Sequence, residues 1–586
     1  MKSQRPVTFN HNPLLEQGLP AWRPRVILLC LLAGSLALAG RAAYLQGFNN
    51  EFLQAQGESR YSRVIPVPAT RGRIADRNGD VLAVSTPVRS IWAIPSDAML
   101  SPADTRQLAA LLETDVQTLN ARLTSERDFV FLRRQVPPEL ARQIADLRLP
   151  GIHQQQEYRR YYPGGDVTAH VLGFTSVDDR GQEGVELAFD QELKGRPGSR
   201  RVIRDRRGQI IEDVESIRLP QDGQDLVLSI DKKIQFLAYS ALREAVEKHK
   251  AYAGSVVVLD ARTGEILALV NAPTFNPNNR NNLSGAQLRN RALTDVFEPG
   301  SMMKPFIAAL ALDHGKVRAD TLIDVGNGRM TMGRATISDV RRPRGPMTVA
   351  SVVKTSSNVG TVKMAMQFEP EEMWRMFDAL GIGTPLSLGF PGEAGGRLRP
   401  ARSWRPIEQA TMSYGYGLSS TLMHMARAYT VFTRDGELLP LSLTRLDAPP
   451  QPLRRVFSPE SAQALREMLE EATGPDGTGG RARVAGYRVA GKTGTAHKLA
   501  GGQYTDKYIS SFVGFAPVSN PRLIIAVMID EPSAGQHFGG AVAAPVFARI
   551  TEGALRTLGV APDAPLAPLH FAGQGGAKPV VVRGNL

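Results

Sequence analysis

Residues 297–306, FEPGSMMKPF, place Ser301 and Lys304 three residues apart, directly after a proline and a glycine. Pro305 has no backbone N–H and is tolerated only near a helix start, so a helix through Lys304 must begin close to Ser301. Positions i and i+3 of a helix lie on one face, so the hydroxyl and the amine would be neighbours. A neutral amine can take the hydroxyl proton and make the serine a nucleophile. The alternative is a core helix with one exposed serine and one exposed lysine.

The pattern Ser-x-x-Lys is weak by itself, because the chain also contains it at Ser229/Lys232 and at Ser351/Lys354. The first of these pairs falls on a predicted strand, where positions i and i+3 face apart. The second falls on a predicted helix face. A proline and a glycine before Ser301 indicate a helix N-terminus there, whose N–H groups suit a nucleophile that produces an oxyanion.

Two further triplets follow along the chain. The triplet SSN at 356–358 is the single Ser-x-Asn of the sequence, and a helix cap or turn is its alternative interpretation. The triplet KTG at 492–494 is the single Lys-[Ser/Thr]-Gly, with a surface turn as its alternative. Residues 486–493, GYRVAGKT, also match the phosphate-loop pattern. Because the chain is predicted to continue as a strand at 495–496 rather than to open a helix, nucleotide binding is not favoured.

Composition limits the classes of function. A chain of 586 residues predicts two or three domains. A net charge of +13 suits nucleic acid, anionic lipid or another acidic polymer. The sequence has no zinc-finger spacing, no RNP-type aromatic motif and no dense basic run, so nucleic acid is not expected as a partner. Cys30 is the single cysteine, which excludes an internal disulfide and a cysteine-based metal site. We expect neither a metal nor an organic cofactor.

An apolar segment near the N-terminus predicts a transmembrane helix over residues 26–45. Residues 26–40, VILLCLLAGSLALAG, carry no charge, and the run to Leu45 is long enough to span a bilayer. Residues 1–25 contain four basic residues against one acid, which predicts a cytoplasmic tail and places the rest outside. A signal peptide cleaved after Ala-Leu-Ala at 37–39 is the alternative, less favoured because the run continues past these small residues.

The body of the chain is predicted to contain two domains. Residues 46–222 show strands, turns and short helices without a dense chemical cluster, which indicates a structural or docking module. Residues 223–560 have strands at both ends and helices between, which predicts one α+β domain whose sheet joins distant segments. Residues 561–586 are rich in Pro, Ala and Gly and are expected to form a flexible tail. The predicted elements of the second domain are a helix at 232–250 and strands at 226–231, 253–260, 265–273, 508–517 and 523–530.

The three motifs in this order resemble the active site of penicillin-binding proteins and serine β-lactamases. The resemblance to class B penicillin-binding proteins, above all those of cell division, covers nearly the whole chain. It implies an α+β fold, with a β-lactamase-like transpeptidase domain (a sheet flanked by helices) on an elongated N-terminal pedestal or dimerisation-type domain with one transmembrane helix. The segments that carry it are RGRIADRNGDVLA (71–83), RRYYPGGDVTAHVLGF (159–174), GVELAFDQEL (184–193), RDRRGQIIEDV (204–214), NPNNRNNL (276–283), YGYGLSSTLMHMARAY (414–429) and FGGAVAAPVFARI (538–550).

The resemblance also implies roles for individual residues. Ser301 would attack a D-Ala-D-Ala carbonyl of a peptidoglycan stem peptide and form an acyl-enzyme, and Lys304 would take its proton. The backbone N–H groups of Ser301 and Thr495 would form the oxyanion hole. The other residues implied in catalysis are Ser356, which passes protons, Asn358, which binds the substrate amide, and Lys492, which supports Ser356. Those implied in binding substrate or β-lactam are Thr493 and Thr495 for the carboxylate, Gly494 for close approach of the backbone, and Phe538 and Tyr416.

One departure from the family pattern and one missing device bear on function. His497 stands where division enzymes often carry Lys or Arg, and we hypothesise that its protonation strengthens carboxylate recognition in mild acid; an ordinary surface histidine is the alternative. Between Asn358 and Lys492 the chain has no asparagine, so the Glu-x-x-x-Asn device of class A β-lactamases is missing. A transpeptidase is therefore expected, with a D,D-carboxypeptidase or a specialised acid-condition paralogue as alternatives.

The resemblance implies partners and a location. The expected substrates are peptidoglycan stem peptides and the lipid-linked nascent glycan, and β-lactams are the expected inhibitors. Other division membrane proteins are the expected protein partners at the septum. The chain would be a single-pass protein of the bacterial inner membrane, with a cytoplasmic N-terminus and a periplasmic catalytic domain.

Overall fold

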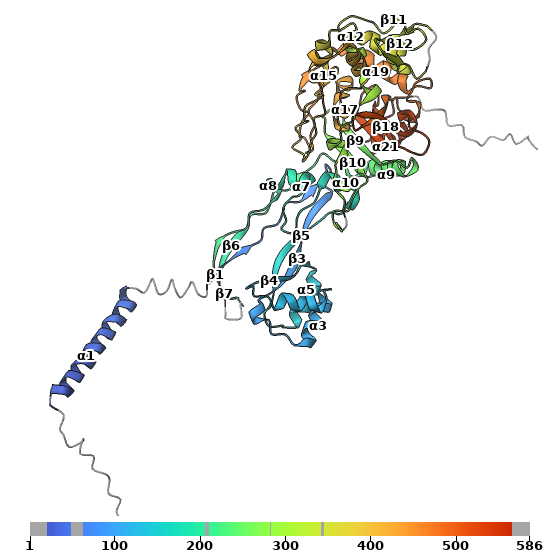
Figure 1. Cartoon of the computed structure of the whole chain (residues 1–586). Coiled ribbons are helices and arrows are strands. Elements are labelled where there is room, and N and C mark those ends of the chain that lie inside the picture. Colours follow the sequence, from blue (N-terminus) through green and yellow to red (C-terminus); the bar gives the residue numbers. More distant parts are fainter. Residues whose placement is uncertain are drawn as a thin grey trace, which may run out of the picture. The chain divides into compact units, whose positions relative to one another are not determined.

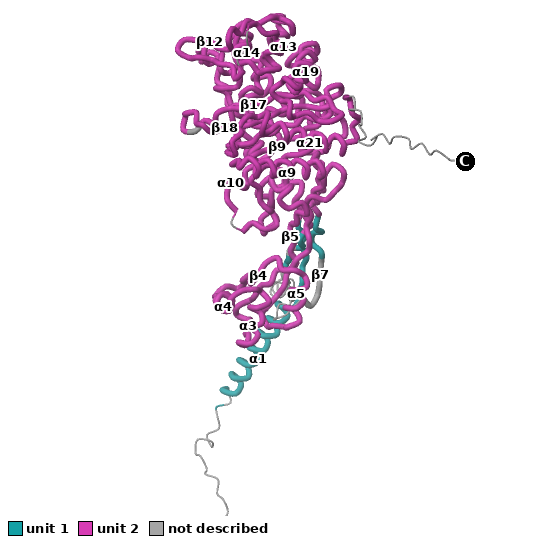
Figure 2. The backbone as a smooth tube through the Cα atoms, turned by 90° about the vertical axis from the view of Figure 1, so that its right-hand side faces the viewer, with its two compact units in different colours: residues 1–68, 197–221 teal, residues 69–196, 222–586 magenta. Residues whose placement is uncertain are grey.

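The computed structural model describes most of the chain, and two compact units make it up (Figure 2). Residues 1–68 and 197–221 form the first unit, and residues 69–196 and 222–586 form the second. The predicted C-terminal tail from residue 565 onward lies outside the described residues. The described residues are 20, 22–48, 62–204, 210–281, 283–341 and 345–564.

The first unit contains the predicted membrane helix. Helix α1 covers Trp22–Ala43 and continues in the π-helical turn η1, Tyr44–Phe48. The stretch Trp22–Gly47 has a mean hydropathy of 2.0 and no buried residue, so its length and composition suit a bilayer-spanning anchor. The helix predicted from residue 26 is confirmed and begins earlier, at Trp22. Figure 1 shows α1 as one continuous helix, and its large apolar side chains are exposed.

The first unit also contains a small antiparallel sheet of order β1-β6-β7. Strand β1, Ser62–Val67, pairs with β6, Gly198–Arg204, and β6 pairs with β7, Ile210–Arg218. The sheet therefore joins chain segments that lie far apart in the sequence.

The N-terminal part of the second unit is built on strand β3, Val81–Ala93. Its sheet has the order β4-β3-β2-β8, and β5 also pairs with β3. Apolar residues of β3 and β4 and of three short helices bury a separate core. The bounds are β2 Ile74–Ala75, β4 Val130–Val136, β5 Ile152–Tyr161, β8 Leu226–Val227, α3 Pro102–Leu111, α4 Val116–Leu123, α5 Pro138–Asp146, α6 Ala169–Leu172, α7 Gly184–Ala188 and α8 Asp190–Leu193.

A buried ionic cluster joins three segments of this part. Arg71 binds Glu186 at 2.6 Å and Asp190 at 2.7 Å, and Arg160 binds the second Glu186 oxygen at 2.7 Å. Arg71 and Glu186 are almost fully buried. A buried charge is costly unless it is paired, so the two arginines and the two carboxylates require one another. The cluster therefore holds the three segments together.

The C-terminal part of the second unit contains a five-stranded antiparallel sheet of order β10-β9-β19-β18-β17. Its strands come from both ends of the region, so the prediction of a sheet that joins distant segments is confirmed. The strand predicted at 226–231 is shorter than expected, since Leu228 forms an isolated bridge with Thr444 beyond β8. The bounds are β9 Ala253–Asp260, β10 Ile266–Ala272, β17 Ala490–Ala500, β18 Gln503–Ala516 and β19 Leu523–Asp530.

Helices cover both faces of this sheet, as Figure 1 shows. Alternate residues of a strand point to opposite faces, and accordingly Val256 and Val258 pack with α9 and α21, whereas Val257 and Leu259 belong to the core of the other helices. Helix α9, Lys232–Lys248, confirms the helix predicted from residue 232 and is capped by Asp231. The other covering helices are α12 Lys304–Asp313, α13 Val349–Thr355, α14 Asn358–Ala365, α15 Pro370–Ala379, α16 Pro406–Ser413, α17 Leu422–Ala428, α18 Thr430–Thr433, α19 Pro459–Thr473 and α21 Ala544–Thr557.

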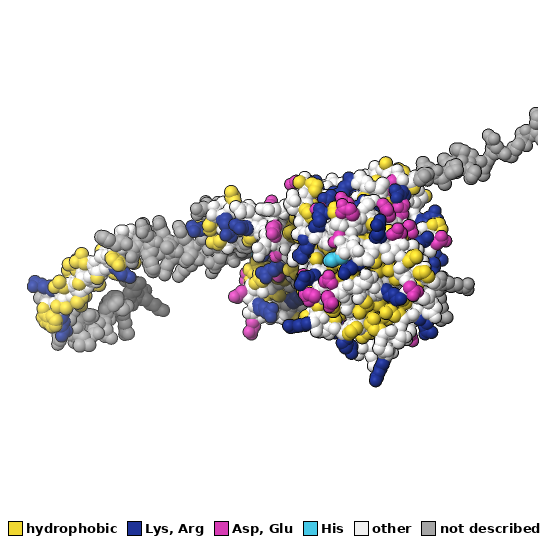
Figure 3. All heavy atoms as spheres, turned by 90° about the horizontal axis from the view of Figure 1, so that it is seen from above, with side chains coloured by type: hydrophobic (Ala, Val, Ile, Leu, Met, Phe, Trp, Pro, Cys, Tyr) yellow, Lys and Arg dark blue, Asp and Glu magenta, His cyan; other side chains and the backbone are white. Residues whose placement is uncertain are grey.

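The remaining short elements lie between these helices and strands. On the face shown in Figure 3, basic and acidic side chains are interspersed, so the net positive charge is not gathered there into one basic surface. The remaining bounds in this part are α10 Gly285–Leu288, α11 Arg291–Thr294, η4 Gly300–Met303, β11 Leu322–Ile323, β12 Arg329–Met332, β13 Ala335–Ser338, β14 Met347–Thr348, η5 Ala401–Ser403, β15 Glu437–Leu438, β16 Arg454–Arg455, η6 Gly480–Ala482 and α20 Gly539–Val542.

Candidate active site

Ser301 lies in a short 3-10 turn, η4, that leads directly into α12. Pro305 stands in the first turn of α12, so the prediction that a helix begins close to Ser301 is confirmed. Gly300 has φ +57°, and its N–H donates to the Gly415 carbonyl at 3.1 Å. Met302 is fully buried, whereas Ser301 is only partly buried. The Ser301 hydroxyl makes no hydrogen bond with another described residue.

Lys304 is buried, and its side chain reaches the second motif. Its Nζ donates to the Ser356 carbonyl at 2.6 Å and lies 3.1 Å from Ser356 Oγ. Burial holds the pKa of Lys304 well below its usual range, the charge of Lys492 lowers it further, and Asp339 opposes these effects. Burial therefore favours the neutral form of the amine, which is the form that can act as a base.

Lys492 brings the third motif to the same buried region. It lies within strand β17, so the surface-turn interpretation of KTG is wrong. Burial lowers the pKa of Lys492 to about 7. Its Nζ lies 3.3 Å from the Thr493 carbonyl and 3.4 Å from Thr493 Oγ1, rather than within hydrogen-bond distance of Ser356. Protonation of both buried amines at once is unfavourable because their charges repel each other. One shared proton can therefore move between the groups of this region.

The SSN motif forms the junction between α13 and α14. Ser356 ends α13 in a left-handed conformation, with φ 62° and ψ 44°. Ser357 caps α14 by accepting from the Gly360 N–H at 2.9 Å, so the capping interpretation applies to this residue. The Asn358 amide donates to the Ser338 carbonyl at 2.7 Å, which ties it to strand β13. The motif therefore combines a cap with one side chain, Ser356, that meets Lys304.

Asp339 is a residue of this region that the motifs did not indicate. Its carboxylate accepts from Ser357 Oγ at 2.7 Å, from the Asn358 N–H at 2.5 Å and from the Val359 N–H at 3.0 Å. A carboxylate at the first N–H groups of α14 holds the junction in place. No pattern in the sequence links Asp339 to the triplet, because the two are joined only by the folding of the β12–β13 hairpin.

Strand β17 is the edge strand of the sheet and runs beside η4. A Cβ atom on Gly300 would lie 3.4 Å from the Thr495 carbonyl oxygen, so the backbone of Thr495 faces the serine turn. A Cβ atom on Gly494 would lie 2.3 Å from Ser511 Oγ and 3.0 Å from Met302 Cγ. Glycine is therefore required for β17 to approach η4 this closely. The unpaired edge can accept an added strand.

The other predicted binding residues surround this edge. Thr493 Oγ1 lies 3.1 Å from Thr478 Oγ1, and Thr495 Oγ1 accepts from the Gly539 N–H at 3.0 Å. Phe538 directly precedes Gly539. It stands at the N-cap position of α20 and is 51% exposed. These contacts attach the segment that carries Phe538 to the third motif.

Tyr416 and His497 meet at the far end of the third motif. The Tyr416 hydroxyl accepts from the His497 backbone N–H at 3.2 Å. His497 Nδ1 lies 3.0 Å from the Thr505 carbonyl, and its ring centroid lies 4.6 Å from that of Tyr508. The imidazole is therefore held by the β17–β18 hairpin rather than free in solvent.

Two further polar residues of this region were missed by the sequence patterns. The Tyr504 hydroxyl donates to Glu298 at 3.1 Å, and the Gly417 N–H donates to the same carboxylate oxygen at 2.7 Å. Glu298 thus links the loop before Ser301 to the loop that carries Tyr416.

Within the described residues, no group of three or more His, Cys, Asp and Glu side chains could hold a metal ion.

Comparison with known families agrees with this geometry. Residues 254–552 match the family described as the penicillin binding protein transpeptidase domain, and residues 66–228 match the penicillin-binding protein dimerisation domain. The chain belongs to the penicillin-binding proteins. The transpeptidase-domain match of this penicillin-binding protein contains all three motifs, and the dimerisation-domain match contains the buried ionic cluster.

Relatives of this penicillin-binding protein are similar over almost their whole length. It is 44% identical over 560 residues to the probable peptidoglycan D,D-transpeptidase PenA of Neisseria gonorrhoeae, covering 94% of this chain and 95% of the relative. It is 42% identical over 552 residues to the peptidoglycan D,D-transpeptidase FtsI of Escherichia coli K12, with 93% of each chain covered. A solved transpeptidase domain of Burkholderia pseudomallei penicillin-binding protein 3 is 50% identical, with a TM-score of 0.54, and covers 58% of this chain and 98% of that one.

Proposed function

We propose that this chain is a serine-type peptidoglycan D,D-transpeptidase that crosslinks stem peptides at the division septum through a Ser301 acyl-enzyme and is acylated by β-lactams. The observation that carries the proposal is that Ser301 lies in the turn that starts α12, beside the edge strand β17, and that Lys304, one helical turn further on, is a buried amine with a lowered pKa. The similarity to D,D-transpeptidases over nearly the whole chain supports the choice of substrate.

The side chains of the site can carry the proton transfers that acylation requires. Ser301 Oγ attacks the carbonyl carbon of the penultimate D-Ala and forms an ester, while its proton passes to Lys304 Nζ. The bond to the terminal D-Ala nitrogen breaks. That amine takes a proton from Ser356 Oγ, which lies 3.1 Å from Lys304 Nζ and regains a proton from it. The nearby Lys492 keeps Lys304 from retaining the proton, and Asn358 binds the substrate amide.

Substrate binding uses the edge of β17. A stem peptide would lie along Thr493, Gly494 and Thr495 as an added strand, with its terminal carboxylate at the two threonine hydroxyls. The N–H groups of Ser301 and Thr495 would bind the developing oxyanion, because both belong to backbone that faces the same point beside η4. Tyr416 and Phe538 would border the cleft.

The second half of the reaction transfers the acyl group to an amine. The amine of a neighbouring stem peptide attacks the ester carbon, the bond to Ser301 Oγ breaks, and Ser301 regains its proton. A D,D-carboxypeptidase would use water instead. The same acyl-enzyme serves both, so the lifetime of the acyl-enzyme and the products decide between them.

We also propose the domain organisation, the location and the partners. A non-catalytic domain over residues 46–222 and a catalytic domain over 223–560 are supported by the two family matches, which end at residue 228 and begin at residue 254. The excess of basic residues before the anchor supports a cytoplasmic N-terminus and an external catalytic domain. Other division membrane proteins would bind the anchor and the non-catalytic domain, and lipid-linked nascent glycan would supply the stem peptides.

The first test is covalent labelling. The full chain, in detergent, is incubated with a fluorescent penicillin beside Ser301→Ala, and the label is followed by gel and intact mass for hours. Persistent labelling of the wild type and none of the variant is expected. The matched control is Ser351→Ala, which removes the serine of a second Ser-x-x-Lys pair and should label as the wild type does. Label that decays within seconds would identify a hydrolase, and no label on the folded wild type would overturn the proposal.

The role of His497 remains a separate proposal. If its protonation strengthens carboxylate recognition in mild acid, the acylation rate of the wild type should rise between pH 7 and pH 5.5, and His497→Arg should remove that rise. The pH profile of acylation for the two proteins is the measurement. Superimposable pH profiles of the two proteins would contradict the proposed role of His497 and remove this support for an acid-condition paralogue.

A further inference from the structure

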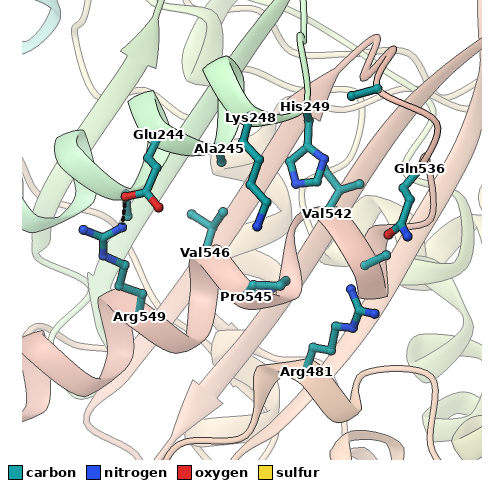
Figure 4. Close-up of a pocket in the computed structure, with 13 residues that line it drawn as sticks. Glu244, Ala245, Lys248, His249, Arg481, Gln536, Val542, Pro545, Val546 and Arg549 are labelled. Carbon is teal, nitrogen blue, oxygen red and sulfur yellow. Dashed lines mark hydrogen bonds and ion pairs between the residues drawn. The ribbon is translucent and has the colours of Figure 1, made fainter.

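A pocket of about 430 Å³ lies in the second unit between α9, α21, α20 and η6, and Figure 4 shows its lining. None of the residues of the three motifs lines it. A volume of a few hundred cubic ångströms is typical of small-ligand sites. The pocket is therefore a candidate binding site distinct from the serine centre.

The charged side chains of the pocket are mainly basic. Figure 4 shows Lys248 extending from α9 into the pocket and Arg481 extending from η6 on the opposite side. Within the described part of the chain, neither makes a hydrogen bond or an ion pair with another residue. The single carboxylate of the lining, Glu244, is already bound by Arg549. The charge of Lys248 also acts on Glu244, but that carboxylate is shared with Arg549. Three cations, Lys248, Arg481 and Arg549, therefore line the pocket against one carboxylate, an arrangement that attracts an anion.

The rest of the lining is apolar with two neutral polar groups. Val542, Pro545 and Val546 form part of the wall from α20 and α21, and Gln536 extends its amide from the loop before α20 (Figure 4). His249 faces the same space, and burial and the charge of Lys248 lower its pKa, so it is a neutral hydrogen-bonding group at pH 7. Apolar walls with a few polar groups and cations suit a ligand with C–H faces, hydroxyls and negative charges.

One segment connects this pocket to the third motif. Gln536 and Val542 line the pocket, and between them the Gly539 N–H donates to Thr495 Oγ1 at 3.0 Å. The His537 carbonyl accepts from Ser510 Oγ at 2.5 Å, in the strand that pairs with β17. A ligand that holds residues 536–542 in place therefore also holds the backbone that supports Thr495.

We propose that this pocket is a second, non-catalytic site that binds a carboxylate-bearing saccharide, namely a peptidoglycan fragment, and that its occupancy speeds acylation of Ser301. The identity of the ligand rests on the proposed function, which places such fragments beside the catalytic domain. Sugar rings supply C–H faces for the apolar wall, and the free carboxylates of the attached peptide supply charges for Lys248 and Arg481.

The test uses the full chain in detergent and a disaccharide–tripeptide from peptidoglycan, which has free carboxylates but no D-Ala-D-Ala bond. Its binding is measured by calorimetry on the wild type and on Ser301→Ala, at low and high salt. Lys248→Glu/Arg481→Glu is the test variant. Lys316→Glu/Arg402→Glu is the matched control, because it makes the same change of charge at exposed residues outside the pocket.

We expect binding to the wild type and to Ser301→Ala alike. The pocket variant should bind at least tenfold more weakly, the control variant should bind within twofold of the wild type, and salt should weaken binding. Amidating the carboxylates of the fragment should have the same effect as the pocket variant. Saturating fragment should raise the rate of labelling by fluorescent penicillin at least twofold in the wild type and not in the pocket variant.

Several results would overturn the proposal. Absence of binding, or binding that the pocket variant retains, would exclude the site. Binding of inorganic pyrophosphate or of vesicles with anionic lipid, without binding of the fragment, would replace the saccharide by a phosphate ligand or a lipid surface. Binding with an unchanged labelling rate would exclude the connection through residues 536–542. Failure of penicillin labelling would instead refute the proposed function, since the fragment can still be tested on Ser301→Ala.

Discussion

At the scale of single residues, the site depends on what burial does to two amines. Lys304 and Lys492 are both almost fully buried, and burial lowers the pKa of each. An exposed lysine at the same spacing from a serine would stay charged at neutral pH and could not take a proton. Lys354, three residues after Ser351, differs from both amines because its side chain is partly exposed and lies 3.9 Å from Asp476.

Replacing Lys304 with methionine should lower the rate of acylation by a β-lactam by about 10²–10⁴-fold, the usual contribution of a general base. The side chains are similar in length, so the packing around Ser356 should persist. Stopped-flow measurement with a fluorescent penicillin gives the rate. Lys354→Met is the matched control and should acylate at the wild-type rate. A Lys304→Met variant that acylates normally would assign the base to another group.

Asp179 is a second residue whose pKa is set by its surroundings. It lies beside the buried ionic cluster with φ 57°, and one of its carboxylate oxygens is buried without a hydrogen-bond partner. Burial raises its pKa to about 6, although the nearby Arg71 and Arg160 oppose this effect. Because the folded state binds the proton more tightly than the unfolded state, the carboxylate destabilises the fold as pH rises through about 6.

Asp179→Asn should therefore stabilise the fold at pH 7.5, by at most about 3 kcal/mol, since each pKa unit corresponds to about 1.4 kcal/mol. Asparagine also tolerates the left-handed conformation. The gain should fade as pH is lowered from 7.5 to 4, because the aspartate becomes neutral. Thermal unfolding of both proteins across this range is the measurement. Equal unfolding temperatures of Asp179→Asn and the wild type at pH 7.5 would contradict the assignment.

At the scale of elements, the packing of β17 against η4 decides whether three distant motifs meet. Gly494 permits this packing because a side chain there would collide with Ser511 from β18 and with Met302 from η4. Neither contact residue belongs to a recognisable motif with Gly494. The requirement for glycine is thus a property of two elements in contact rather than of the triplet.

Gly494→Ala should destabilise the fold by about 1–3 kcal/mol, as overpacking of a core does. It should also lower the acylation rate by about 10–100-fold, because a shift of η4 displaces Ser301. Thermal unfolding and the rate of penicillin labelling are the two measurements. Gly285→Ala is the control, because a Cβ atom at that position would meet nothing within 4 Å. Wild-type stability together with wild-type labelling of Gly494→Ala would refute the close packing.

At the scale of the whole molecule, one apolar helix near the N-terminus separates a short basic segment from the remaining chain. The charge difference across α1 predicts the orientation, since basic residues stay on the cytoplasmic side. Cys30 lies within α1 and is the single cysteine of the sequence, so a cysteine-free protein needs one substitution.

In a Cys30→Ser background, Ser96→Cys should react with a membrane-impermeant maleimide in cells whose outer membrane has been permeabilised. Ser96 is exposed and follows the anchor. Ser3→Cys precedes the anchor and should react only after the inner membrane is opened. Gel mobility after labelling measures both. The opposite pattern would reverse the proposed orientation, and labelling of both would indicate that the chain does not span the membrane.

The local sequence determined the anchor, the helix start at Ser301, helix α9 and the main strands of the catalytic sheet. Each of these depends on neighbours within one element: an apolar run, a proline that fits only a first helical turn, or apolar residues at helix or strand spacing. The family resemblance then ordered the three motifs and named their members. The strand at 226–231 was predicted too long, because its later residues form contacts with a segment more than 200 residues away.

Only the tertiary structure decided which groups surround the motifs and what protonation states they favour. Asp339 follows the β12–β13 hairpin and Ser511 lies in β18, and neither belongs to a motif, so no spacing could have indicated them. Glu298 stands three residues before Ser301, but its contacts with Gly417 and Tyr504 depend on the fold. The low pKa of Lys304 arises from burial and from Lys492, 188 residues further along the chain by their numbers. Sequence fixes which chemistry a chain carries, but desolvation and charge coupling depend on three-dimensional neighbours.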